Sequence, residues 1–483
     1  MHTGTLAGAG LDFKKPCVIM PPGILKGVQP APDHRVAWLD GEFGRNQGTF
    51  RGWNPLEHER RLLHLIRIIL ETLAGICGAF LTFSMLYQII IGFWGFKKAE
   101  KDYQDHDPEM RFLVLIPAHN EERVIGDIVR NLKRMDYPED LYDFYVIADN
   151  CTDGTAEKAR RLGAKVIETR KESPDAPTGK PIALRKALNQ IDYQDQYDLM
   201  MIFDADNLID LNMFREVNSQ YLDKGRPDFI QCYLGAKNKS GVVAWFYYTG
   251  YTLSNRFFNL AKQRLGLNGV IGGTGFAMST SYLARRGGWT TMTLTEDYEM
   301  QLEATLEGRR ILWNHFTRVY DEKPTRLSAA IRQRIRWGQG HWYVTLHNTG
   351  KLFRALFSGT ISFWEFLSLG TYMYSVAATV AALIQMALTF ALCAIIPERS
   401  FFDPSVRGVL ISVALISYSY FFLFYYADWM DNGIRFQIRT IPMMIGGFFA
   451  NAIVGFFNQV FGLLRCGDQQ HWVKTEHSIS GIR

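Results

Sequence analysis

The sequence predicts an α/β domain with a mostly parallel sheet, joined to helices that lie in or on a membrane. Two observations support this fold class. Roughly between residues 108 and 324, short apolar runs alternate with amphipathic segments, which is typical of a parallel sheet covered by helices. On both sides of this block are uncharged apolar segments long enough to cross a bilayer.

Within the block, four apolar runs are expected to form buried strands, at 112–116, 144–148, 165–168 and 199–203. Four segments with helical amphipathicity are expected to form helices, at 121–134, 155–162, 180–190 and 211–224. Strand and helix therefore alternate along the block, and we assign the domain to residues 108–326.

The N-terminal flank has two parts. Residues 1–54 are rich in Gly and Pro without periodicity and are expected to be an irregular extension. Residues 55–98 hold the first membrane signal. Positions 56–71 mix Arg60, Arg61, Arg67 and Glu71 with Leu and Ile, a pattern suited to an amphipathic helix on the membrane surface. Positions 72–96 are uncharged and predict a first transmembrane helix.

The C-terminal flank begins with a basic amphipathic stretch inside 327–360, which we assign to interface helices. Residues 361–465 contain three apolar segments. Segments 366–396 and 409–427 predict spans, whereas 440–464 is interrupted by Pro442 and several Gly and Asn residues and is expected to lie in the interface. With two spans here, the tail at 466–483 lies on the same side as the catalytic block.

Composition excludes several classes of protein. The 53 basic and 48 acidic residues give a net charge of +5, well below the concentrated charge of a nucleic-acid binder. This mild excess suits an anionic membrane surface and phosphate-bearing substrates. The six cysteines include no CxxC pair, which argues against a disulfide framework or a zinc site and for a reducing compartment.

The candidate chemistry lies where strands end, because ligands of open α/β sheets bind beyond the carboxyl ends of the strands. His119 and Glu121 follow the first strand, and Asp149 follows the second. Asp204 and Asp206 follow the fourth. Two carboxylates at this spacing can hold Mg²⁺ or Mn²⁺ together with a nucleotide diphosphate. The alternative for each group is a turn or a helix cap.

Two further groups lie later in the chain. In Thr295-Glu296-Asp297, an Asp could act as a general base, or these residues could begin a helix. In Gln333-Arg334-Ile335-Arg336-Trp337, Arg can clamp a diphosphate and Trp can stack on a sugar ring. The alternative is a basic helix at a lipid surface.

Taken in order, Asp149, Asp204-x-Asp206, Thr295-Glu296-Asp297 and Gln333-x-x-Arg336-Trp337 resemble the signature of membrane-integrated family 2 glycosyltransferases. This family includes the cellulose, chitin and hyaluronan synthases. The resemblance implies a GT-A type domain that faces the cytoplasm in a multi-pass protein of the plasma membrane. It further implies metal-dependent, inverting transfer from a UDP-sugar, with UDP-glucose preferred, to make and export a β-linked polysaccharide processively.

The resemblance also implies roles for individual residues. The nucleoside pocket would be lined by His119, Glu121 and Asp149, with Lys180 near the nucleotide or donor sugar. Asp204 and Asp206 would hold the metal and diphosphate. Catalysis would rest on Asp297 as general base, with Glu296 and Arg336. The remaining substrate contacts implied by the resemblance are Gly273, Thr274, Phe276, Gln333 and Trp337, and a gating segment with Trp472, Lys474 and Thr475.

Two other functions remain open at this stage. The first is transfer of one sugar to a membrane lipid, since some lipid glycosyltransferases also carry the pattern Gln-x-x-Arg-Trp. The second is a membrane receptor or transporter with a nucleotide-binding domain, which leaves the order of the four groups unexplained. The expected partners are a UDP-sugar, a growing polysaccharide or lipid acceptor and the bilayer, without nucleic acid. The oligomeric state is left open.

Overall fold

The computed structural model describes residues 55–173, 176–395 and 404–469. The expected extension at 1–54 and most of the tail lie outside the described residues. The chain divides into two units, Met1–His58 and Glu59–Arg483. Of the first unit only the start of one helix is described, so the fold below is that of the second.

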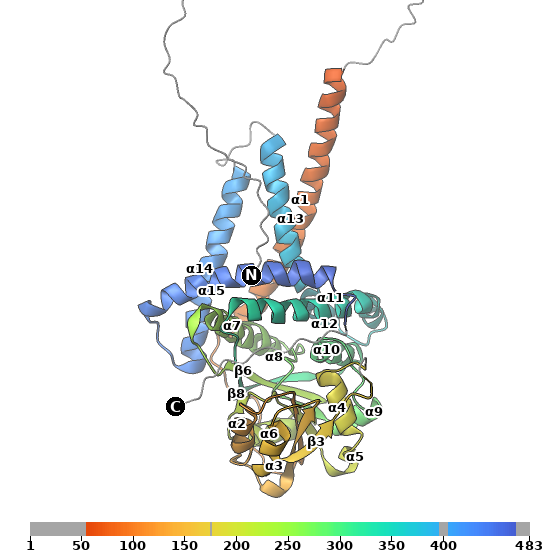
Figure 1. Cartoon of the computed structure of the whole chain (residues 1–483). Coiled ribbons are helices and arrows are strands. Elements are labelled where there is room, and N and C mark those ends of the chain that lie inside the picture. Colours follow the sequence, from red (N-terminus) through yellow and green to blue (C-terminus); the bar gives the residue numbers. More distant parts are fainter. Residues whose placement is uncertain (1–54, 174–175, 396–403, 470–483) are drawn as a thin grey trace, which may run out of the picture. The chain divides into compact units, whose positions relative to one another are not determined.

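The centre of the second unit is an eight-stranded mixed sheet with strand order β3-β2-β1-β4-β7-β6-β8-β5 (Figure 1). Strands β3, β2, β1 and β4 are mutually parallel, as predicted, whereas β7 pairs antiparallel with both β4 and β6. The strands are β1 Phe112–Ala118, β2 Tyr142–Asp149, β3 Lys165–Thr169, β4 Leu199–Ile202, β5 Leu208–Ile209, β6 Phe229–Ala236, β7 Phe276–Ser279 and β8 Ile311–Asp321.

Helices cover both faces of the sheet, and the alternation along β1 shows why. Phe112, Val114 and Ile116 pack with α2, α3 and α6 on one face, while Leu113 and Leu115 pack with α4, α5, α9 and α10 on the other. These helices are α2 Ile125–Leu132, α3 Thr155–Arg161, α4 Lys180–Leu188, α5 Tyr193–Gln196, α6 Met213–Asp223, α9 Thr280–Arg285 and α10 Glu296–Leu306. All four predicted helices are present, with shorter bounds.

Strands β5 to β8 were not predicted from the sequence. Strands β6 and β8 carry polar side chains that a buried apolar strand lacks, yet these are buried and hydrogen-bonded. Gln231 donates to the carbonyl groups of Cys232 and Thr274, and Asn314 donates to Gln220 Oε1 at 2.9 Å. These polar positions hide the apolar strand pattern in the sequence, and the sequence does not reveal their distant partners Thr274 and Gln220.

Above the sheet lies a layer of long helices next to its carboxyl-end edge (Figure 1). Helix α7 (Gly241–Ser254) continues through a π-helical turn, η3 (Asn255–Leu260), into α8 (Ala261–Arg264). Helix α11 (Leu327–Phe357) begins at the predicted residue and packs on α10 and α12 through Tyr298, Val344 and Leu369.

Helix α15 (Ile441–Leu464) runs alongside α7 and α11. A Cβ added at Gly462 would approach Gly338 Cα to 2.9 Å, and one added at Gly446 would approach Val242 to 3.0 Å. One face of α15 is therefore buried against the catalytic part. The opposite face exposes apolar side chains such as Phe449 and Ile453. The interface location of this segment stays a prediction, because Ile438–Leu464 is also long and apolar enough to cross a membrane.

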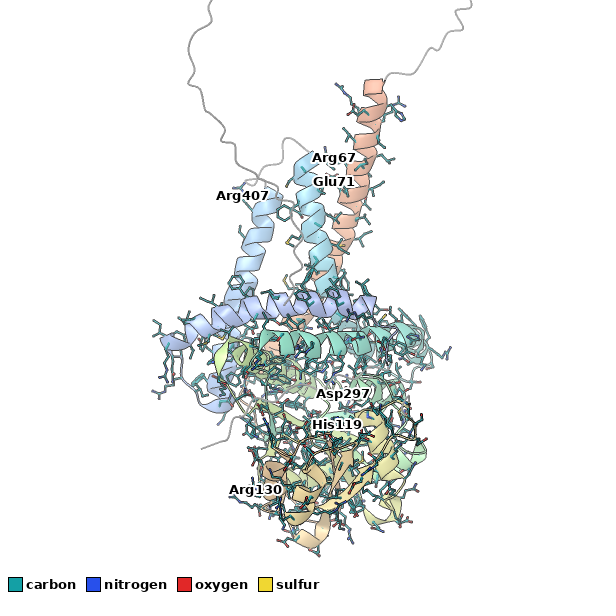
Figure 2. The ribbon with its side chains drawn as sticks, viewed as in Figure 1. Arg67, Glu71, His119, Arg130, Asp297 and Arg407 are labelled. Carbon is teal, nitrogen blue, oxygen red and sulfur yellow. The ribbon has the colours of Figure 1, made fainter. Side chains whose placement is uncertain are left out.

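The first apolar helix differs from the expected arrangement of a surface helix followed by a span. Residues Pro55–Phe93 form one continuous helix, α1, which at 1.5 Å per residue is roughly 58 Å long, about twice the hydrocarbon thickness. No Gly or Pro separates the two predicted parts. Arg67 and Glu71 point toward each other one turn apart and form an ion pair at 3.1 Å (Figure 2).

The predicted span at 366–396 is also wrong as a single helix, because the chain breaks at Tyr374 into α12 (Phe363–Met373) and α13 (Ser375–Ile395). His341 Nε2 lies 3.0 Å from the Met373 carbonyl oxygen, and Thr345 donates to the same oxygen at 3.2 Å. Both side chains of α11 therefore contact the carbonyl oxygen of the last residue of α12.

In the described part of the chain, three helical segments are long and apolar enough to cross a membrane: His58–Phe96, Ser375–Ile395 and Ile438–Leu464. The predicted span at 409–427 lies within α14 (Pro404–Asn432). The end of α14 is fixed to the catalytic part by a buried ion pair between Asp431 and Arg256 of η3, and His315 of β8 lies 3.0 Å from the same carboxylate.

Candidate active site

A cavity of about 1410 Å³ opens at the carboxyl ends of β1, β2 and β4, between the sheet and α11. Figure 2 labels two residues of its lining, His119 and Asp297. Except for Phe276, the cavity brings together every predicted site residue that the structure describes. These are His119, Glu121, Asp149, Lys180, Asp204, Asp206, Gly273, Thr274, Glu296, Asp297, Gln333, Arg336 and Trp337.

The first wall is built where β1 and β2 end. Asn120 and Asn150 adopt left-handed conformations, with φ of 56° and 49°, which are uncommon for residues other than Gly and turn the chain sharply at both strand ends. His119 Nδ1 lies 2.7 Å from the carbonyl oxygen of Asp149. The Asp149 carboxylate accepts hydrogen bonds from Thr169 and Asn150, both at 2.8 Å. This wall is thus fixed by hydrogen bonds between neighbouring strands.

Asp204 and Asp206 follow β4, and Asn207 holds them in place. Asn207 Oδ1 accepts from the Asp204 backbone N–H at 3.0 Å, and its Nδ2 donates to Asp206 Oδ1 at 3.1 Å. Asn207 is fully buried. Its position after the two Asp residues is the only sequence signal that could have identified it.

The Asp204 and Asp206 carboxylates fit a divalent cation that is shared with a substrate. In the described ranges, no group of three or more His, Cys, Asp and Glu side chains is arranged to hold a metal. The two Asp residues would therefore supply part of the coordination shell, and phosphate oxygens and water would supply the rest. Mg²⁺ is commonly bound in this way, by one or two carboxylates together with phosphate and water. About 45% of the Asp204 side chain is exposed, so a cation can reach it from the cavity.

Lys180 connects the Asp pair to the opposite wall. Its ammonium group lies 2.8 Å from Asp204 Oδ1 and 3.9 Å from Glu296 Oε1, and it donates to the Gly273 carbonyl oxygen at 2.6 Å. Burial disfavours the ammonium form, but the Asp204 and Glu296 carboxylates outweigh burial and raise the pKa of Lys180. Lys180 therefore stays charged beside Asp204.

Glu296 and Asp297 form the first turn of α10 beneath α11. Burial raises the pKa of Glu296 to about 7, against the opposing effect of Lys180, and burial also raises the pKa of Asp297. Gly273, with φ of 76°, lies directly against Asp297, because an added Cβ would come within 2.9 Å of Asp297 Oδ2. A buried carboxylate with a raised pKa is a stronger base, which suits proton abstraction.

Helix α11 closes the cavity with cationic and aromatic side chains. Gln333 Oε1 accepts from Tyr247 at 2.7 Å, and Trp337 meets the Tyr247 ring edge-on. The Arg334 guanidinium lies 4.6 Å from the Trp337 ring. Burial lowers the pKa of Arg336, while the nearby carboxylates of Glu296, Asp204 and Asp297 favour its charged form. Tyr247 and Arg334, which fix these side chains, were not predicted.

Of the predicted site residues that the structure describes, Phe276 is missing from the lining of the cavity. Phe276 belongs to β7, is 1% exposed and packs in the core against α4 and α9, so the expected substrate contact at Phe276 is not made. Trp472, Lys474 and Thr475 lie outside the described residues. The described chain ends at Gln469, which lines the cavity and accepts from the Leu294 N–H at 3.1 Å.

Beyond the carboxylates, the cavity has an aromatic wall that the sequence did not reveal. The ring of Tyr298 stacks on His341 at 4.3 Å, and Tyr372 lies within 5.5 Å of both rings. Phe258 of η3 continues this wall at 5.9 Å from Tyr372. Burial lowers the pKa of His341 to about 4, so its ring is neutral and adds a flat uncharged surface.

Residues 108–340 match the family model described as "Glycosyltransferase like family 2". The matched region includes the whole sheet and every predicted residue that lines the cavity.

Curated relatives also match part of the chain. The chain is 26% identical over 292 residues to a beta-monoglucosyldiacylglycerol synthase of Nostoc sp., covering 57% of this chain and 58% of the relative. It is 24% identical over 237 residues to a poly-beta-1,6-N-acetyl-D-glucosamine synthase of Staphylococcus aureus, covering 48% of this chain and 55% of the relative. The chain thus spans about half the length of the curated relatives it matches.

A solved structure extends the similarity in fold. A mannosyltransferase from Pyrobaculum calidifontis, in complex with GDP-Man and Mn²⁺, superposes with a TM-score of 0.54 at 19% identity. The match covers 80% of this chain and 99% of that chain. The mixed α/β sheet is therefore GT-A-like, which confirms the predicted fold class.

Proposed function

Residues 108–340 form a family 2 glycosyltransferase domain, and from this premise we propose that the chain transfers a hexose from a UDP-sugar to an acceptor held in the membrane. The observation that carries the proposal is the continuity of the cavity. The same cavity that holds Asp204 and Asp297 is lined by Ser375 and Val376 at the start of α13 and by Tyr420 of α14. A donor in the aqueous half and an acceptor from the apolar helices would meet there.

The side chains suit an inverting displacement. Asp297 accepts the proton of the acceptor hydroxyl as the oxygen attacks the anomeric carbon from the face opposite the leaving diphosphate. Lys180 and Arg336 offset the negative charge that grows on the diphosphate. When bound, a divalent cation held by Asp204 and Asp206 supplies further positive charge at this position. Trp337 offers an apolar ring face to the acceptor.

A lipid is the acceptor that the helices favour. In the most apolar stretches of α1 and α13, only 11% and 6% of residues are buried, so these helices present apolar surfaces suited to direct contact with lipid. The similar Nostoc protein is named for glucosyl transfer to diacylglycerol. We therefore propose glucose as the sugar and a diacylglycerol-type lipid as the acceptor.

Processive synthesis and export of a β-linked polysaccharide is the second candidate, and the aromatic wall favours it. Phe258, Tyr298 and Tyr372 line the cavity beyond the carboxylates, and ring faces of this kind bind successive sugars. The Staphylococcus aureus relative is named as a synthase of such a polymer.

We place the catalytic domain on the cytoplasmic face of the plasma membrane, because nucleotide sugars are cytosolic. Helix α15 then lies in the interface, with its exposed apolar face toward lipid and its buried face on α7 and α11. This arrangement keeps Gln469, which accepts from the Leu294 N–H, on the catalytic side.

The test is product analysis with purified full-length protein in vesicles that contain diacylglycerol. The protein is given labelled UDP-glucose, UDP-N-acetylglucosamine or UDP-glucuronate with Mn²⁺. A labelled product that partitions into organic solvent as a single glycolipid supports the lipid acceptor. A labelled product that is large and insoluble in organic solvent supports the polymer. Absence of sugar transfer from all three donors, in protein that binds UDP, contradicts both.

A further inference from the structure

A second hollow, separate from the active-site cavity, lies where α9 and α10 face the C-terminal part of α11. Its volume is about 710 Å³. The lining is strongly basic and comprises Arg285, Arg286, Arg309, Lys351 and Arg354, beside Glu303 and Glu307. None of these residues belongs to the machinery described above, so the family function does not account for this concentration of charge.

The basic residues divide into a paired and an unpaired set. Arg286 pairs with Glu303 and with Glu307 at 3.0 Å, and Arg285 pairs with Asp228 at 2.9 Å. Arg309 also pairs with Asp228, at 3.6 Å, so the five cations of the hollow outnumber Glu303, Glu307 and Asp228 by two. Among the described residues, Lys351 and Arg354 form no ion pair, and the buried Nε atoms of Arg286 and Arg309 have no hydrogen-bond partner.

Next to the hollow, α11 exposes an apolar face that does not itself line the hollow. On α11, Leu346, Phe353 and Phe357 recur at i, i+7 and i+11, which places them on one exposed face, and Phe357 is 83% exposed. Phe363 and Trp364 at the start of α12 add exposed rings, with Trp364 68% exposed. A stripe of aromatic side chains beside free cations is typical of a helix at the surface of an anionic membrane.

We propose that this hollow binds the phosphate headgroup of an anionic phospholipid. Lys351 and Arg354 contact the phosphate, and the acyl chains lie along Phe353, Phe357 and Trp364. The two unpaired cations favour an anionic headgroup over a zwitterionic one, because a zwitterionic lipid carries no net charge. The neighbouring apolar face of α11 and α12 favours a lipid over free phosphate, since only a lipid covers exposed rings. Helix α13, which begins soon after α12, keeps this face close to the bilayer.

The experiment measures binding to full-length protein in a neutral detergent. The probes are short-chain phosphatidylglycerol, short-chain phosphatidylcholine and glycerol 3-phosphate. We expect phosphatidylglycerol to bind tightest. The double substitution Lys351→Gln with Arg354→Gln should weaken phosphatidylglycerol binding by roughly tenfold or more, as expected for loss of two cations at an anionic surface. Lys351→Arg with Arg354→Lys should retain the affinity.

A matched control removes two exposed cations elsewhere, with Lys133→Gln and Arg134→Gln at the end of α2. Arg130, in the last turn of α2, marks that distant region in Figure 2. This control should bind phosphatidylglycerol like the unaltered protein. The proposal also requires that both double variants keep UDP binding, melting temperature and sugar transfer in neutral detergent.

Three outcomes would overturn the inference. Equal binding of phosphatidylglycerol and phosphatidylcholine rejects an anion site. Glycerol 3-phosphate binding as tightly as the lipid indicates a site for soluble phosphates. Because cations also stabilise the carboxyl end of a helix, a lower melting temperature with unchanged lipid affinity would assign Lys351 and Arg354 to the stability of α11 alone.

Discussion

Gly273→Ala tests how tightly the base must be held, because Gly273 is in contact with Asp297. The added Cβ would lie 2.9 Å from Asp297 Oδ2, whereas ordinary contacts begin near 3.4 Å. The carboxylate must therefore move by about 0.5 Å, the tolerance within which catalytic groups have to be held. Since misplacement by about 1 Å costs roughly a hundredfold in rate, we expect turnover to fall by about tenfold to a hundredfold, with UDP affinity nearly unchanged.

Backbone strain alone must be separated from this displacement. Gly273 has φ of 76°, and Ala in this conformation costs about 1–2 kcal/mol. Gly225 offers a matched control, with φ of 73° and nothing within 4 Å of the added Cβ. Both variants should lose similar stability in thermal unfolding, while only Gly273→Ala should lose sugar transfer per folded molecule. Equal turnover in the two variants would refute the proposed placement of the base.

Three further predictions concern the same cavity. Excess EDTA should stop sugar transfer, and Asp206→Asn should raise the Mn²⁺ concentration needed for half-maximal rate; full turnover in EDTA would reject the metal site. Trp337→Ala should slow transfer by roughly tenfold to a hundredfold, as loss of about 1–3 kcal/mol of stacking predicts, with UDP affinity retained; early melting with normal turnover would assign Trp337 to membrane anchoring. Burial raises the pKa of Glu296 to about 7. The protonated form therefore stabilises the fold below pH 4.5, and this contribution is lost as pH rises through 7. Thermal unfolding should show this loss in the unaltered protein and a weaker one in Glu296→Gln.

The parallel half of the sheet could be predicted because its strands are short apolar runs and its helices are amphipathic. The site residues at the edge of the sheet could also be predicted, since Asp149 and Asp204 directly follow predicted strands. The other half could not be predicted for a physical reason. Strand β8 buries Asn314 and His315, and their partners Gln220 and Asp431 are remote in sequence. Phe276 was misplaced because its strand, β7, was not foreseen.

The helical flanks show a second limit of prediction from the sequence. The break between α12 and α13 has no Gly or Pro signal, because it depends on side chains of α11 that bond to the Met373 carbonyl. Similarly, Asn207 and Tyr247 matter only through the residues they hold, Asp206 and Gln333. Hydrophobic periodicity reports which face of an element is buried. It does not report which distant polar groups meet there.

The most direct test of the account is a comparison of Asp297→Asn with the unaltered protein in single-turnover sugar transfer. The substitution keeps the size of the side chain and removes its basicity. UDP-sugar affinity measured on the same preparation should stay within a few-fold, while transfer should fall by roughly a hundredfold to ten-thousandfold, the usual contribution of a positioned base. Near-normal transfer by Asp297→Asn would contradict the central claim and leave Asp297 as a residue of the α10 first turn only.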